Sequence, residues 1–128
     1  MELEIGLKNE VEGRSTEETS AVAMGSGSLK VLSTPSMIAL MEQAASELVD
    51  RNLPADRTSV GISLNVKHIA ATPIGLKLRA EATITSIDGR KIIFDVRAFD
   101  EREEIGRGTH ERFIVDRKNF QSKADGKR

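Results

Sequence analysis

The sequence predicts a single α+β domain in which a curved, mostly antiparallel sheet wraps one long helix. One segment, residues 34–51, carries apolar side chains around most of a helix. Roughly five or six other stretches alternate apolar and polar residues with a period of two, as strands do. An Asp-Gly pair at 88–89 separates two of these stretches and is typical of a tight hairpin. A chain of 128 residues is long enough for one such domain and too short for two.

The first part of the chain predicts two extended segments and a loop. Leu3, Ile5 and Leu7 alternate with polar residues or glycine, which indicates a half-buried strand. A second, weaker extended run is expected over residues 16–24. The sequence "GSGS" at 25–28 interrupts this pattern and is expected to form a mobile flap before the helix.

The central helix has a well-marked start and an unexpected interior residue. Thr34 fits the capping position, and Pro35 fits the first helical position, where its missing N–H costs nothing. The apolar pattern then continues to about residue 51 or 52. Because the apolar residues are not confined to one stripe, the sheet is expected to wrap most of the helix. Glu42 lies in the middle of this segment, on a helical row with apolar residues on both sides.

The second half of the chain predicts an antiparallel meander. From Thr58 onward one strand has an apolar face that ends in His68 and comprises Val60, Ile62, Leu64 and Val66. Residues 76–84 and 92–98 form the two arms of the hairpin. After a charged turn, a last strand is expected from about residue 105 to 115.

The domain is expected to end near residue 117. Residues 1–117 form the predicted folded unit, whereas the polar segment 118–128 has little to bury and is expected to be a disordered tail. A sheet that covers a helix on one face leaves a second face and two open edges. Proteins often cover such edges by pairing subunits, so we expect a homodimer or a tetramer.

Composition limits the classes of partner and of chemistry. The 19 Lys and Arg residues balance 20 Asp and Glu residues, which gives no global field to recruit nucleic acid. The absence of cysteine excludes disulfides and thiolate sites, and two histidines without an H-E-x-x-H motif make a metal site improbable. The charged, alternating N-terminus and the lack of a long apolar run predict a cytoplasmic protein without membrane contact.

Three polar side chains on apolar elements form a weak catalytic constellation. Each has a purely structural interpretation: Thr34 caps the helix, Glu42 reaches solvent at the edge of the sheet, and His68 is a satisfied core residue. Eight helical residues separate Thr34 from Glu42 by roughly 12 Å, so the two cannot touch. A substrate lying between them could be polarised by Thr34 and the helix start, attacked with help from Glu42, and hydrogen-bonded by His68. This pattern suggests acyl chemistry without a metal.

Arg112 lies in "GRGTHERFIVD", where it shares one side of the last strand with His110 and two glycines. An arginine and a histidine beside glycines suit a polar or anionic ligand that approaches the backbone closely. The alternative is an ordinary solvated strand face. The loop "GSGS" is not a Walker phosphate loop, because it lacks the Gly-Lys-Ser/Thr ending.

Three stretches resemble the hotdog-fold acyl-CoA thioesterases, in the branch typified by fluoroacetyl-CoA thioesterase: "VLSTPSMIALMEQAA", "SVGISLNVKHIAATPIG" and "GRGTHERFIVD". The resemblance covers roughly residues 3–115. The family's catalytic threonine, glutamate and histidine, its glycine and its late-strand arginine match in order and spacing. The matching residues are Thr34, Glu42, His68, Gly61 and Arg112.

This resemblance implies a hotdog dimer with two active sites at the subunit interface and coenzyme A only as part of the substrate. It implies that Glu42 acts on the thioester with Thr34 and His68 assisting, while Gly61 and Arg112 bind the substrate or hold the site. The fluoroacetyl-specific enzyme has aromatic lid residues ahead of the helix, whereas this chain has "GSGSLKV" there, so another acyl group is expected. Two alternatives remain, a noncatalytic acyl-CoA-binding hotdog protein and a hotdog enoyl-CoA hydratase or dehydratase.

Overall fold

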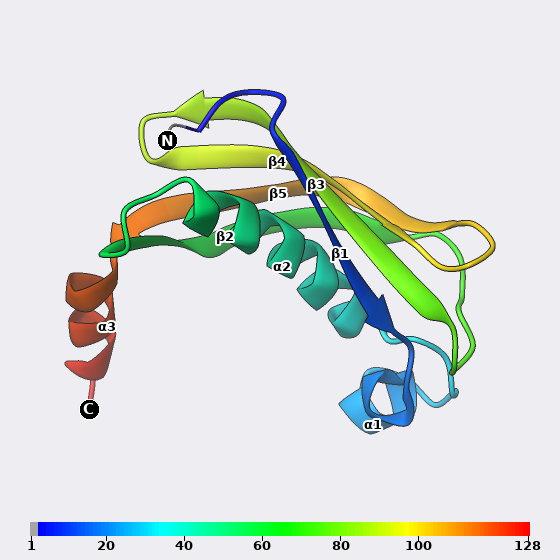
Figure 1. Ribbon diagram of the computed structural model, residues 1–128. Helices are drawn as coiled ribbons and strands as arrows, with labels where there is room; N and C mark the ends of the chain where they lie inside the picture. The colour runs from blue at the N-terminus through cyan, green and yellow to red at the C-terminus, as the bar shows by residue number, and fades with distance from the viewer. Residues whose placement is uncertain (1–2) are drawn as a thin grey trace.

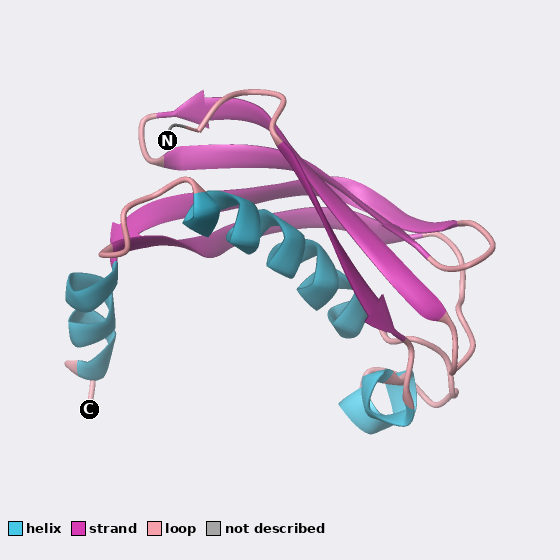
Figure 2. Cartoon of the chain, in the orientation of Figure 1, coloured by secondary structure: helices cyan, strands magenta, loops and turns pink. Residues whose placement is uncertain are grey.

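The computed structural model describes residues 3–128 and has one five-stranded antiparallel sheet that curves around a long helix (Figures 1 and 2). The strands lie in the order β1-β3-β4-β5-β2, so β1 and β2 form the two edges. The elements in chain order are β1 (Lys8–Arg14), a 3₁₀ turn η1 (Glu17–Thr19), α1 (Ala21–Met24), α2 (Thr34–Arg51), β2 (Arg57–His68), β3 (Lys77–Asp88), β4 (Lys91–Phe99), β5 (Glu104–Asp116) and α3 (Arg117–Asp125). The predicted α+β class is confirmed.

The core lies between α2 and the concave face of the sheet. Six α2 residues are buried there: Met37, Met41, Ala44, Ala45, Leu48 and Val49. The predicted hairpin of β3 and β4 faces them with alternating buried residues, among which Ala80, Ala82 and Ala98 are small enough for the helix to approach closely. The sheet wraps less of the helix than expected, because a stripe through Ala39, Gln43 and Glu47 stays exposed.

The start of α2 differs from the prediction by one residue. Ser33 is the N-cap, and its hydroxyl accepts a hydrogen bond from the backbone N–H of Ser36 at 3.1 Å. Thr34 is therefore the first helical residue and Pro35 the second. The hydroxyl of Thr34 is therefore not used for capping, which leaves it able to contact a side chain outside the helix.

The N-terminal prediction was wrong in two places. The first strand is β1 at Lys8–Arg14 rather than residues 3–7, and its inward Asn9 is satisfied by donating to the carbonyl of Ala44 at 3.0 Å. The run expected to be extended at 16–24 forms η1 and α1 instead. Local hydrogen bonds explain this, since Ser20 accepts from the N–H of Ala23 and caps α1.

A β-bulge in β2 changes which residues face the helix. Pairing with β5 shifts between Gly61 and Ser63, so Ile62 is the extra residue. Before the bulge, Gly61 points at the side chain of Glu42 on α2; after it, His68 pairs with Thr34 at the start of α2. The expected apolar face is therefore broken, and Ile62 is 51% exposed at the sheet edge.

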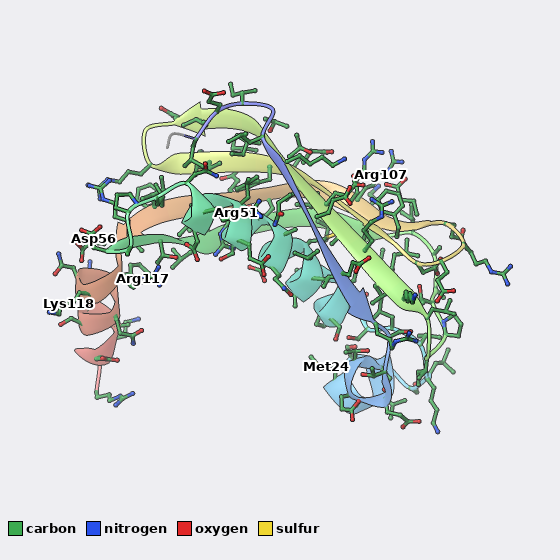
Figure 3. The ribbon with its side chains drawn as sticks, in the orientation of Figure 1. Met24, Arg51, Asp56, Arg107, Arg117 and Lys118 are labelled. Carbon is green, nitrogen blue, oxygen red and sulfur yellow. The ribbon has the colours of Figure 1, made fainter. Side chains whose placement is uncertain are left out.

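The C-terminal segment was also predicted incorrectly. Residues expected to lack regular structure form α3, which Asp116 caps by accepting from the N–H of Asn119. This helix projects from the end of the sheet, and Arg117 and Lys118 lie at its root, far from Met24 on α1 (Figure 3). No helix within residues 3–128 is both long and apolar enough to cross a bilayer.

Candidate active site

The Thr34–His68 pair joins the start of α2 to the end of β2. The Thr34 hydroxyl oxygen lies 2.8 Å from His68 Nδ1, which is hydrogen-bond distance. The other ring nitrogen, Nε2, is buried and has no hydrogen-bond partner among the described residues. Burial lowers the pKa of His68, although a backbone contact with Ala70 raises it in part. The ring is thus biased toward its neutral form, with one nitrogen left for a reacting group.

A cavity of about 350 Å³ opens beside this pair. The segment before α2 and the loop after β2 form its walls, and Ser26 of the predicted flap is one of the lining residues. The remaining wall consists of Ser33 and six small or aliphatic residues, which are Ala21, Val31, Leu32, Ile69, Ala70 and Ala71. A pocket that combines aliphatic side chains with several polar groups suits an acyl chain whose carbonyl meets those polar groups.

Glu42 belongs to a second cluster, formed by α2, β2 and β5. Its side chain is 38% exposed, and one carboxylate oxygen lies 3.8 Å from Arg112 Nη1. Gly61 lies against the same oxygen, since a Cβ at this position would come within 2.7 Å of it. The predicted trio Glu42, Gly61 and Arg112 is therefore brought together, and glycine at position 61 leaves room for the carboxylate.

Arg112 is buried and held by neutral acceptors. Its Nε donates to the Ser59 hydroxyl at 2.7 Å and its Nη2 to the Ser59 carbonyl at 3.0 Å. Its Nη1 lies 3.1 Å from Nε2 of His110, a fully buried ring. Burial lowers the pKa of Arg112, and the charge of Glu42 acts in the opposite direction.

His110 is a member of this cluster that was not among the predicted site residues. The sequence did place it on the same side of the strand as Arg112, and that shared side was the available signal. Its Nδ1 lies 2.9 Å from the carbonyl of Ser63, just beyond the bulge. Desolvation lowers the pKa of His110, which keeps the ring neutral.

The two clusters are separate within one chain. Thr34 and Glu42 are eight residues apart on one helix, so about 12 Å of helix axis lies between them. Nothing within residues 3–128 groups three or more His, Asp or Glu side chains in a way that could hold a metal ion. The predicted residues therefore form a Thr34–His68 pair and a carboxylate–guanidinium cluster rather than one compact triad.

Comparison with known proteins identifies the family to which this arrangement belongs. The profile of the fluoroacetyl-CoA-specific thioesterases matches residues 15–118, which contain both clusters. The chain belongs to the fluoroacetyl-CoA-specific thioesterase family. It is accordingly a thioester hydrolase of the hotdog superfamily, as the sequence resemblance predicted.

Individual relatives support this assignment. The fluoroacetyl-CoA thioesterase of Streptantibioticus cattleyicolor is 37% identical over 94 residues, which are 73% of this chain and 68% of the relative. A solved structure of the fluoroacetyl-CoA thioesterase FlK superposes with a TM-score of 0.92 over 98% of both chains, at 28% identity. A hot-dog-like protein from Thermanaerovibrio acidaminovorans shares the fold, with a TM-score of 0.86 over 96% of this chain and 91% of that one, at 20% identity.

Proposed function

We propose that this protein hydrolyses acyl-CoA thioesters, with Glu42 as the reacting carboxylate and with Thr34 and His68 acting on the thioester carbonyl. The observation that carries this proposal is the 2.8 Å contact between Thr34 and His68 at the wall of the cavity. The positive end of the α2 dipole also lies there and favours the negative charge that develops on a carbonyl oxygen under attack, although Pro35 has no N–H and those of Ser36 and Met37 bond to Ser33. Family membership supplies independent support for the thioester as substrate.

Two routes are chemically consistent with a carboxylate in this position. In one, Glu42 takes a proton from water as the water oxygen adds to the carbonyl carbon, and the C–S bond then breaks to release coenzyme A. In the other, a carboxylate oxygen adds to that carbon and expels coenzyme A, and water hydrolyses the acyl-glutamyl intermediate in a second step. In either route Gly61 and Arg112 keep the carboxylate placed for the reaction.

The natural acyl group is expected to be aliphatic and different from fluoroacetyl. FlK itself has been solved with acetyl-CoA, and with fluoroacetate and coenzyme A, in mutant forms. In this chain the cavity beside Thr34 is lined by aliphatic and small polar residues and by His68, and within residues 3–128 no phenylalanine lines it. A release assay over a panel of acyl-CoAs of increasing chain length would identify the preferred group.

The site is proposed to be completed by a second subunit. Strand β2 is an edge strand, and its Ile62 and Leu64 are 51% and 39% exposed. Antiparallel pairing of two copies of β2 about an axis between Leu64 and Asn65 would set Gly61 opposite His68 of the partner subunit. Glu42 would then face the pair formed by the partner's Thr34 and the partner's His68, which closes the gap between the two clusters.

The test of the reaction is the Glu42→Gln variant, which keeps the shape of the side chain and removes its charge. It should fold, pair and bind acyl-CoA while thiol release falls by orders of magnitude, because the lost interaction is needed only on the way to the transition state. Under the nucleophilic route, wild-type protein quenched during turnover should carry an acyl adduct on Glu42. Normal hydrolysis by well-folded variant protein would refute both routes.

The test of the shared site is subunit complementation. Inactive Glu42→Gln and His68→Ala subunits are mixed under conditions that exchange subunits, with each variant alone as control. A mixed dimer would have one intact site, so random mixing should restore about a quarter of wild-type activity, since about half of the dimers are mixed. No recovery in a confirmed mixed dimer, or a monomer by light scattering with full activity, would contradict the shared site.

A further inference from the structure

The tautomer of His110 is fixed by its two neighbours. A carbonyl oxygen can only accept, so the contact of Nδ1 with the Ser63 carbonyl at 2.9 Å requires a proton on Nδ1. A guanidinium can only donate, so the contact of Nε2 with Arg112 Nη1 at 3.1 Å requires an unprotonated Nε2. The ring also stacks on Phe94, with centroids 6.0 Å apart. His110 is thus a neutral, immobile acceptor for Arg112.

Arg112 makes three close hydrogen bonds, and Glu42 accepts none of them. Two go to the hydroxyl and carbonyl of Ser59, and the third goes to His110. The Glu42 carboxylate stays 3.8 Å from Nη1, which is within ion-pair range but beyond hydrogen-bond distance. Arginine and carboxylate ordinarily close into a short, often bidentate pair, so the longer separation needs a cause.

The competing acceptor is that cause. We propose that His110 is a positioning residue that holds Nη1 of Arg112 away from Glu42. The carboxylate then interacts electrostatically with the guanidinium but forms no hydrogen bond with it. A carboxylate in a short bidentate pair would be a poorer base and nucleophile, because its lone pairs would be committed to the guanidinium. This inference rests on the proposed function of Glu42 and adds His110 to the residues on which the reaction depends.

The two halves of the imidazole can be tested separately. Asparagine carries an amide group near the position of Nδ1, and glutamine carries one near the position of Nε2. His110→Gln therefore keeps an acceptor for Arg112 and loses the contact with Ser63, whereas His110→Asn does the reverse. Each variant keeps one hydrogen bond of the imidazole and removes the other, but asparagine is one methylene shorter than glutamine and leaves more buried volume unfilled, so each kcat is compared with the melting temperature of the same variant.

The expected result is a difference in kcat between these variants. His110→Gln should keep kcat within about threefold of wild type, while His110→Asn should lose roughly tenfold to a hundredfold with little change in KM, as expected for a misplaced reacting group. Thermal unfolding of both variants is measured alongside. Equal kcat values, or kcat values that follow melting temperature instead of the retained acceptor, would overturn the proposal.

A second measurement on wild-type protein needs no turnover. Nitrogen-15 NMR of the His110 ring should show a protonated Nδ1 and an unprotonated Nε2 that is hydrogen-bonded to an Arg112 N–H. A protonated Nε2, or no coupling between the two side chains, would overturn the proposal even if hydrolysis is normal. Conversely, wild-type protein that shows this NMR pattern but hydrolyses no acyl-CoA would contradict the proposed function while leaving the His110–Arg112 contact in place.

Discussion

Replacing Gly61 with alanine should separate catalysis from stability. The added Cβ would lie 2.7 Å from a carboxylate oxygen of Glu42, whereas ordinary contact begins at 3.4 Å, so that oxygen must retreat by about 0.7 Å. The retreat of Glu42 itself costs little folding energy, because the atom is the end of a flexible, partly exposed side chain, but the Cβ would also lie 3.2 Å from Cε1 of the buried His110 ring. A displacement approaching 1 Å at a reacting group can cost a hundredfold in rate, so we expect a loss of roughly tenfold to a hundredfold in kcat.

The backbone of Gly61 does not require glycine, because its φ lies outside the left-handed range. Alanine restricts the unfolded chain, which stabilises the fold by about 0.4–1 kcal/mol, and the tight contact with His110 offsets part of this gain. The melting temperature should therefore stay within a few degrees of wild type. Gly13→Ala in β1 is the matched control, because its Cβ meets only the flexible end of Leu40 at 3.1 Å. The assay is thiol release together with thermal unfolding. A folded Gly61→Ala protein with the kcat of the control would refute the proposed role of Gly61.

Three further predictions follow from the same geometry. His68→Ala should lower kcat by about a hundredfold to ten-thousandfold with a smaller effect on melting temperature; normal kcat with early melting would restore the core-histidine interpretation. Because burial lowers the pKa of both His68 and His110 from 6.5, the unfolded chain binds more protons than the folded chain just below that pH. Melting temperature should therefore hold above pH 6.5 and fall as pH drops below it, and a flat profile down to about pH 5 would argue against neutral buried rings. Deleting residues 118–128 should leave folding and turnover largely intact, because no residue of α3 is buried; loss of the proposed dimer by light scattering would contradict this and show that α3 packs between subunits.

The sequence was sufficient for the features that depend on periodicity. The long α2 and the hairpin at Asp88-Gly89 follow from apolar spacing and turn chemistry, and the structure has both. The features that were missed depend on single hydrogen bonds. Ser33 and Thr34 are both good capping residues, and only the contact with Ser36 decides between them. Ser20 and Asp116 likewise start helices where polar composition suggested extended or disordered chain.

The sequence predicted which residues belong to the candidate site better than it predicted how they are arranged. Glu42 and Arg112 stood out in the sequence itself and Gly61 was added by the resemblance, and the three do meet. Periodicity could not reveal that Gly61 and His68 face the same helix. Seven residues apart, they would lie on opposite faces of a regular strand. His110 was not predicted as a site residue, because its proposed role depends on which atoms contact its ring. Strand alternation does not give these contacts.

The extra residue in β2 determines how insertions and deletions in this strand would act on the site. A bulge interrupts the ladder with β5, and a chain lacking Ile62 could restore regular pairing and lose a half-exposed apolar side chain. That deletion would leave Gly61 and His68 six residues apart, an even spacing that keeps both on the face toward α2 in a regular strand. Straightening the strand with Ile62 retained would instead turn one of the two away, so a library of single-residue insertions and deletions in β2 should keep hydrolysis only where both residues stay on that face.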